Sequence, residues 1–189
     1  MAGTNEMVET LKDVVTRLDE LGIDYMVTGS FAMSIYATAR MTIDIDIVLD
    51  IASTDVHRIE SQFGDDYYVD GEAIRRAEMR QSMFNMISNI NGVKVDCIVK
   101  KRDQFDTERF SRRKRSRIGK IEFWAIGKED LIMSKLRWAK DSHSEMQFRD
   151  VRNLIESGVD TSALMSDIER FSLGGVWSAF EEWKIQAAK

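Results

Sequence analysis

The stretch "TGSFAMSIYATARMTIDIDIVLD", residues 28–50, carries the pattern that decides the fold. Its second half is an apolar run typical of a buried strand, but Asp44 and Asp46 interrupt that run at alternate positions. Side chains at positions i and i+2 point to the same face of a strand, so both carboxylates project together. Because like charges repel, the pair indicates either a cation-binding site or a solvated strand end.

The first half of the stretch contains a turn that suits a phosphate group. Residues 23–28 predict a short buried strand that runs into Gly29 and Ser30, where a helix is expected to begin. Glycine permits close approach to the backbone, and the N–H groups of a helix start, with the Ser30 hydroxyl, are donors for a triphosphate.

A third acid, Asp96, interrupts the apolar segment "VKVDCIV", residues 93–99. This segment and residues 82–88 flank Asn91-Gly92, which is a strong hairpin signal, so we expect an antiparallel pair beside the strand of residues 41–50. Adjacent strands would bring the three carboxylates together. Three such oxygen donors suit Mg²⁺ with bound phosphates.

Helical and strand patterns along the rest of the chain predict an α+β fold: a small mixed β-sheet flanked by helices, with a helical C-terminal lobe. A charged helix is expected over residues 106–117 and a strand over residues 120–126. We expect residues 1–126 to form the core and residues 127–189 to form the helical lobe packed on it.

Composition narrows the class of protein. The chain has 189 residues, a net charge of -5 and 43% hydrophobic residues, which is unlike a basic nucleic-acid-coating protein. A single cysteine, Cys97, excludes an internal disulfide, and two histidines argue against a His/Cys zinc site. With a polar beginning and no apolar run of about 20 residues, we expect a cytoplasmic protein that is not in a membrane.

These residues resemble the nucleotidyltransferase superfamily with the polymerase-β-like core. That signature is Gly-Gly or Gly-Ser, then Asp-x-Asp between apolar residues, then a third acid on a later strand. The segment "ARMTIDIDIVL", residues 39–49, and later blocks up to residue 154 are similar to the bacterial branch that includes uncharacterised nucleotidyltransferase-like proteins and AbiEii-type toxins. One departure is that the late aspartate, Asp150, lacks a second acid three residues later.

The resemblance implies transfer of a nucleoside monophosphate from an NTP to a hydroxyl of an RNA, a protein or a small molecule, with Mg²⁺ or Mn²⁺ as cofactor. It implies that the metal ligands are Asp44, Asp46 and Asp96, the last also a candidate general base. A lysine that neutralises pyrophosphate is matched by Lys135. The implied nucleotide-binding residues are Gly29, Ser30, Arg40, Thr42 and Asp150.

Two other functions stay open. The same fold could serve a nucleotide-binding regulatory protein without turnover, or one half of a toxin–antitoxin pair with an antitoxin-type partner. The basic run "RRKRSR", residues 112–117, is either an RNA-binding patch or a solvated helix end.

Overall fold

A computed structural model describes residues 3–37, 42, 44–142 and 144–187. The chain divides into two compact units. Unit 1 comprises Met1–Ala32 and Arg40–Ile126, and unit 2 comprises Met33–Ala39 and Gly127–Lys189. The boundary passes through one helix, α2 (Gly29–Tyr36).

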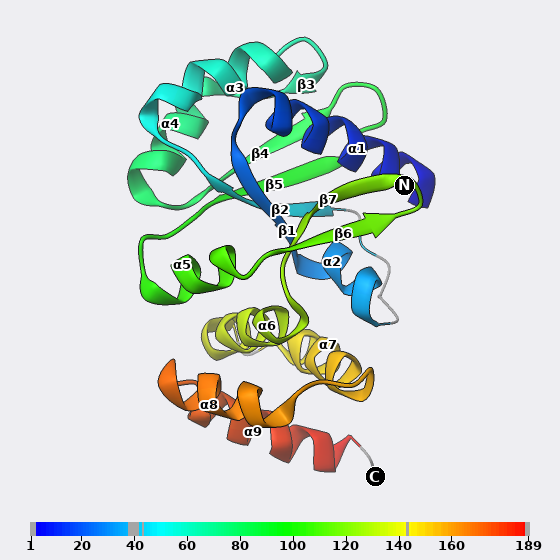
Figure 1. The fold of residues 1–189 in the computed structure, drawn as a ribbon, viewed down its shortest axis with the longest axis vertical. Coiled ribbons are helices and arrows are strands. Elements are labelled where there is room, and N and C mark those ends of the chain that lie inside the picture. Colours follow the sequence, from blue (N-terminus) through cyan, green and yellow to red (C-terminus); the bar gives the residue numbers. More distant parts are fainter. Residues whose placement is uncertain (1–2, 38–41, 43, 143, 188–189) are drawn as a thin grey trace. The chain divides into compact units, whose positions relative to one another are not determined.

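Unit 1 is built on one mixed sheet (Figure 1). Its strands are β1 (Asp24–Thr28), β2 (Asp44–Asp50), β3 (Tyr67–Tyr68), β4 (Met83–Ser88), β5 (Lys94–Val99), β6 (Lys114–Ile118) and β7 (Ile121–Ala125). The strand order is β3-β4-β5-β2-β1-β7-β6. Pairs β2–β5 and β1–β7 are parallel and the other neighbours are antiparallel, which confirms the predicted mixed sheet. The predicted hairpin on Asn91-Gly92 is also confirmed, as β4 and β5.

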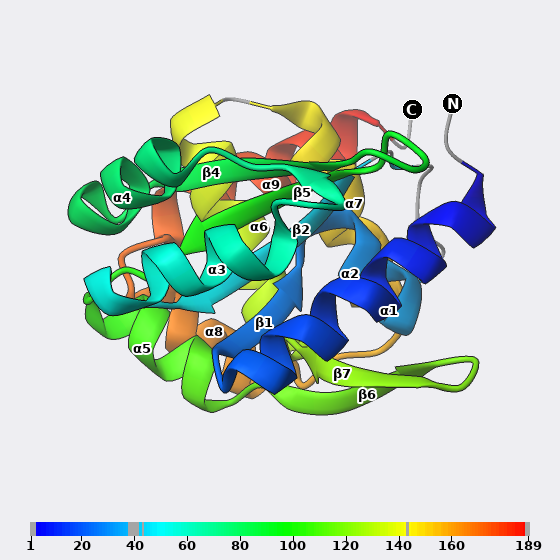
Figure 2. The same cartoon turned by 90° about the horizontal axis from the view of Figure 1, so that it is seen from above.

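Helices cover one face of this sheet, as Figures 1 and 2 show for α1, α3 and α4. The helices of unit 1 outside the shared α2 are α1 (Thr4–Leu21), α3 (Val56–Phe63), α4 (Gly71–Arg80) and α5 (Gln104–Ser111), with a short 3-10 turn at Ser53–Asp55. The buried side chains on the covered face are apolar and include Ile45, Ile47, Val95 and Cys97. α1 contacts β1 and β2 and α4 contacts β4 and β5, so the polar groups of β2 and β5 are left on the opposite face.

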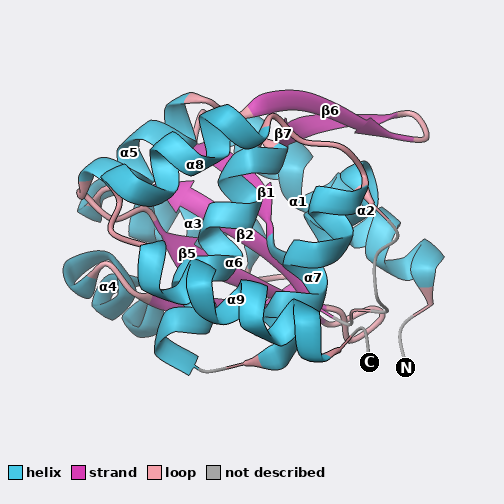
Figure 3. Cartoon of the chain, turned by 90° about the horizontal axis from the view of Figure 1, so that it is seen from below, coloured by secondary structure: helices cyan, strands magenta, loops and turns pink. Residues whose placement is uncertain are grey.

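Unit 2 consists mainly of four helices in the described part of the chain (Figure 3). These are α6 (Lys128–Ser142), α7 (Glu145–Glu156), α8 (Thr161–Arg170) and α9 (Gly174–Gln186). An aromatic cluster joins α7 to α9, with the Phe148 ring 5.8 Å from both Phe180 and Trp183. None of the helices in the described residues is both long enough and apolar enough to cross a bilayer.

The prediction of a helix over residues 106–117 was wrong in its second half. The helix expected over residues 106–117 ends at Ser111, and the basic residues that follow form the edge strand β6. Lysine and arginine are good helix formers, but here all five residues of β6 pair with β7 around a turn at Gly119, whose φ is +59°. From Lys114 onward the basic run is therefore an exposed sheet edge, whereas Arg112 caps the end of α5. Charged side chains on such an edge also oppose pairing with another chain.

Candidate functional site

A row of polar side chains crosses four strands on the face of the sheet opposite the apolar core. Asp46 of β2 lies between Thr28 of β1 and Asp96 of β5, and Asp96 in turn lies beside Asn85 of β4. Directly paired residues share one face, so these four side chains project together. The row lies where β1 ends and near the starts of β2 and β5.

The acids come from two parallel strands in register. Asp44 pairs with Lys94, and Asp46 pairs with Asp96 one step further along both strands. The alternation that places Ile45 and Val95 in the core therefore places all three carboxylates on the other face. This is the juxtaposition that the sequence pattern predicted.

Gly29 lies directly against one of these acids. Its φ of +66° is a left-handed conformation that favours glycine. A Cβ added here would lie 2.8 Å from Asp46 Cβ and closer still to the carboxylate. The absent side chain is thus what allows the Asp46 carboxylate to rest on the backbone where β1 turns into α2.

The other predicted nucleotide-binding residues near the acids are placed as follows. Ser30 is buried in the first turn of α2. The Thr42 hydroxyl donates to the Asp44 carbonyl over 3.2 Å, and the Asp44 N–H lies 3.4 Å from the same hydroxyl. Thr42 thereby fixes the backbone entering β2. Arg40 lies outside the described residues.

Lys94 is a site residue that the sequence prediction missed. Its ammonium group lies 2.9 Å from Asp96 Oδ1 and 3.0 Å from Oδ2. That hydrogen bond, with further attraction from Asp96, Asp44 and Asp46, raises the pKa of Lys94 above its ordinary value, against the opposing effect of burial. A signal was present in the sequence, because Lys94 stands two residues before Asp96 on a strand and must share its face.

Asn85 is a second residue that the prediction missed. With its amide oriented so that nitrogen faces the acid, Asn85 donates to Asp96 Oδ1 over 2.7 Å. The Asp96 side chain is 11% exposed, so Asn85 and Lys94 together hold a largely buried carboxylate in one orientation. The signal available in the sequence was Asn85 itself, a polar residue within the otherwise apolar segment of residues 83–87.

The donor set is chemically suited to Mg²⁺ or Mn²⁺. Carboxylate oxygens are the preferred ligands of such hard cations, which keep several waters and need few protein ligands. The backbone cradle at Gly29 and the ammonium of Lys94 beside the acids show that this corner accommodates positive charge. In this arrangement, no group of three His, Cys, Asp or Glu side chains within the described residues is gathered closely enough to hold a metal.

Lys135 and Asp150 are brought together in unit 2. Lys135 Nζ on α6 lies 2.6 Å from Asp150 Oδ2 on α7, with side chains 5% and 3% exposed. Gln147 Oε1 lies 3.4 Å from the same ammonium. The pair joins two helices as a buried ion pair.

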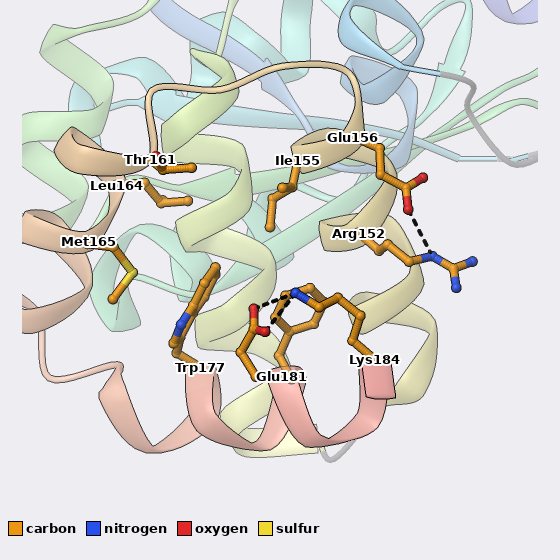
Figure 4. A pocket seen from close by; sticks show the side chains of 10 residues that line it. Arg152, Ile155, Glu156, Thr161, Leu164, Met165, Trp177, Glu181 and Lys184 are labelled. Atoms are coloured by element: carbon orange, nitrogen blue, oxygen red, sulfur yellow. Dashed lines mark hydrogen bonds and ion pairs between the residues drawn. The ribbon is translucent and has the colours of Figure 1, made fainter. Parts of the chain in front are cut away.

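Unit 2 also contains a cavity of about 380 Å³ between α7, α8 and α9 (Figure 4). Its wall is apolar and aromatic, and two ion pairs, Arg152–Glu156 and Lys184–Glu181, lie along its edge. The remaining lining residues are Ile155, Thr161, Leu164, Met165, Trp177 and Phe180. None of the residues predicted for the nucleotide site lines it.

Comparisons with known proteins support the fold. No protein-family model matches the chain, and a search of curated proteins finds no match either. Among solved structures, the antibiotic-resistance factor ANT(2'')-Ia aligns over 97% of this chain and 100% of its own, with 11% identity and a TM-score of 0.60.

Two further structures are similar to the chain. An antigenic nucleotidyltransferase-like protein from Paracoccidioides brasiliensis covers 95% of this chain and 94% of its own, at 18% identity and a TM-score of 0.58. The lincosamide antibiotic adenylyltransferase LnuA covers 81% of this chain and 96% of its own, at 13% identity and a TM-score of 0.52. At such identities the likeness establishes a nucleotidyltransferase fold.

Proposed function

We propose that this chain transfers a nucleoside monophosphate from an NTP to an acceptor hydroxyl, with Asp44 and Asp46 as ligands of Mg²⁺ or Mn²⁺. The observation that carries the proposal is that Asp46 lies directly against Gly29, where α2 begins, and pairs in register with Asp96 on the neighbouring strand. The similarity of the fold to adenylyltransferases supports the same reaction class.

The reaction needs groups that hold the triphosphate and accept a proton. α2 begins at Gly29, directly after β1, and the N–H groups at the start of a helix are suited to hold a phosphate. A metal ion bound by Asp44 and Asp46 supplies positive charge for the reacting phosphate.

The bond changes follow from this arrangement. The acceptor hydroxyl oxygen forms a bond to the α-phosphorus, while the bond from that phosphorus to the oxygen bridging to the β-phosphate breaks. Pyrophosphate leaves, and the hydroxyl proton passes to the Asp96 carboxylate. The proposal assigns no step to Lys135 or Asp150, because these side chains are buried against each other in unit 2.

Three acceptor classes fit this reaction: an RNA end, a protein hydroxyl, or a small molecule. Solved structures of similar fold include LnuA with lincomycin bound and ANT(2'')-Ia with adenylyl-2"-tobramycin. A hydroxyl-rich antibiotic is therefore one acceptor to test. An acidic chain with net charge -5 would attract a cationic acceptor more than a polyanion.

The test is label transfer from each of four α-labelled NTPs, with Mg²⁺, to total RNA, a protein extract, or a panel of aminoglycosides and lincosamides. Transfer that is lost in the Asp44→Asn/Asp46→Asn variant supports the proposal. Asp50→Asn is the matched control, because Asp50 ends the same strand, is exposed and pairs with Lys100. Nucleotide binding that is equal in all variants, without transfer, would favour a regulatory protein instead.

A further inference from the structure

The sheet face proposed to bind the metal ion also carries a positively charged side chain, that of Lys94. Lys94 is the first residue of β5 and pairs with Asp44 across the parallel ladder. Its ammonium contacts both oxygens of Asp96 and is attracted by Asp44 and Asp46 as well. Lys94 therefore offsets the charge of Asp96 by direct contact and is also attracted by Asp44 and Asp46, the two acids that the proposed function assigns to the metal.

The Lys94 side chain can contact the Asp96 carboxylate and can also move away from it. The Lys94 side chain is 36% exposed, whereas the Asp96 side chain is 11% exposed and also accepts from Asn85. A flexible four-carbon chain can swing its charge into solvent, but the carboxylate is held by the sheet. Of the two partners, the lysine is the one that can move.

A metal ion and an ammonium group cannot both occupy this corner without strong repulsion. Two positive charges a few ångströms apart repel each other strongly at the effective dielectric of a protein surface. Metal binding must then displace Lys94.

We propose that Lys94 is a built-in counter-ion that holds the metal position until it is displaced by the metal. This inference rests on the proposed function, since it takes the acids to be metal ligands. Its consequence is that the protein binds a free divalent cation weakly. A metal that arrives with a triphosphate brings anionic oxygens that the displaced ammonium can contact, so metal and nucleotide binding become coupled.

The test is a titration of the nucleotide-free protein with Mn²⁺. Binding is measured from the decrease in the electron paramagnetic resonance signal of free Mn²⁺. Lys94→Gln is expected to bind Mn²⁺ about tenfold more tightly than wild type, because one repelling charge is removed. Lys94→Arg keeps the charge and should bind weakly. The matched control is Lys114→Gln, which removes the same charge from an exposed position on β6.

A second measurement separates this role from simple destabilisation. In EDTA, Lys94→Gln should unfold at a lower temperature than wild type because three carboxylates lose their counter-ion, and added Mn²⁺ should restore more stability to it than to wild type. The inference is overturned if Lys94→Gln binds Mn²⁺ no more tightly than wild type. If the Asp44→Asn/Asp46→Asn variant binds Mn²⁺ as well as wild type, or if no variant binds it, the metal site itself is wrong.

Discussion

Replacing Gly29 by alanine probes the contact on which the site depends. The substitution has two costs. Placing a Cβ at a φ of +66° costs about 1–2 kcal/mol. Forcing that Cβ into the space of Asp46 adds about 1–3 kcal/mol, which is typical of overpacking. Gly29→Ala should therefore lower the free energy of unfolding by about 2–5 kcal/mol.

Gly22 provides a control for the backbone cost alone. It ends α1 with a φ of +64°, and nothing lies within 4 Å of an added Cβ. Gly22→Ala should therefore lose only about 1–2 kcal/mol. Urea unfolding followed by far-ultraviolet circular dichroism measures both values.

A double-mutant cycle then isolates the contact with the acid. In an Asp46→Ala background the carboxylate is gone and only the 2.8 Å contact with the Cβ of residue 46 remains, so Gly29→Ala should cost clearly less than it does in the wild-type background. The reasoning is refuted if Gly29→Ala in the wild-type background is no more destabilising than Gly22→Ala. It is also refuted if removing the Asp46 carboxylate leaves the cost of Gly29→Ala unchanged.

Two further predictions concern buried groups outside the proposed site. Asp150→Asn should destabilise the protein by about 3–5 kcal/mol in urea unfolding, because it removes a buried carboxylate that lies 2.6 Å from the buried Lys135 ammonium. A loss below about 1 kcal/mol would contradict this. Burial raises the pKa of the Cys97 thiol, so the thiolate should stay scarce from pH 7 to 9. Iodoacetamide should then label Cys97 in native protein far more slowly than in urea, and equal rates would show that this thiol is accessible.

The central part of the site was predictable from local pattern. Alternation within β2 places Asp44 and Asp46 on one face, and the hairpin signal at Asn91-Gly92 placed the strand bearing Asp96 beside them. Gly29 was identified by its place between a strand and a helix. These inferences need only strand periodicity and turn chemistry, which act over a few residues.

What the sequence did not reveal depends on contacts between distant segments. The strand β6 exists because its residues pair with β7, and this pairing outweighs the helical preference of the basic run. Lys135 and Asp150 were expected near the nucleotide, which stays a prediction, and the structure shows that the two side chains contact each other across α6 and α7. A side-chain pairing 15 residues apart cannot be read from either helix pattern alone.

The role of Lys94 could not be predicted from the sequence for a different reason. Its position two residues before Asp96 placed it on the correct face, but a lysine at a strand end is usually an ordinary solvated residue. Only the register with Asp44, which came from the tertiary pairing of β2 with β5, shows that its charge lies among the acids.

The most direct test of the central claim is a crystal structure with Mn²⁺ and an NTP analogue that has a methylene group between the α- and β-phosphates. Anomalous scattering at the manganese edge locates the ion without ambiguity. The account predicts Mn²⁺ within coordination distance of Asp44 and Asp46, with phosphate oxygens completing its shell and Lys94 moved off Asp96. A nucleotide bound elsewhere, or Mn²⁺ absent from these acids while Lys94 stays on Asp96, would contradict it.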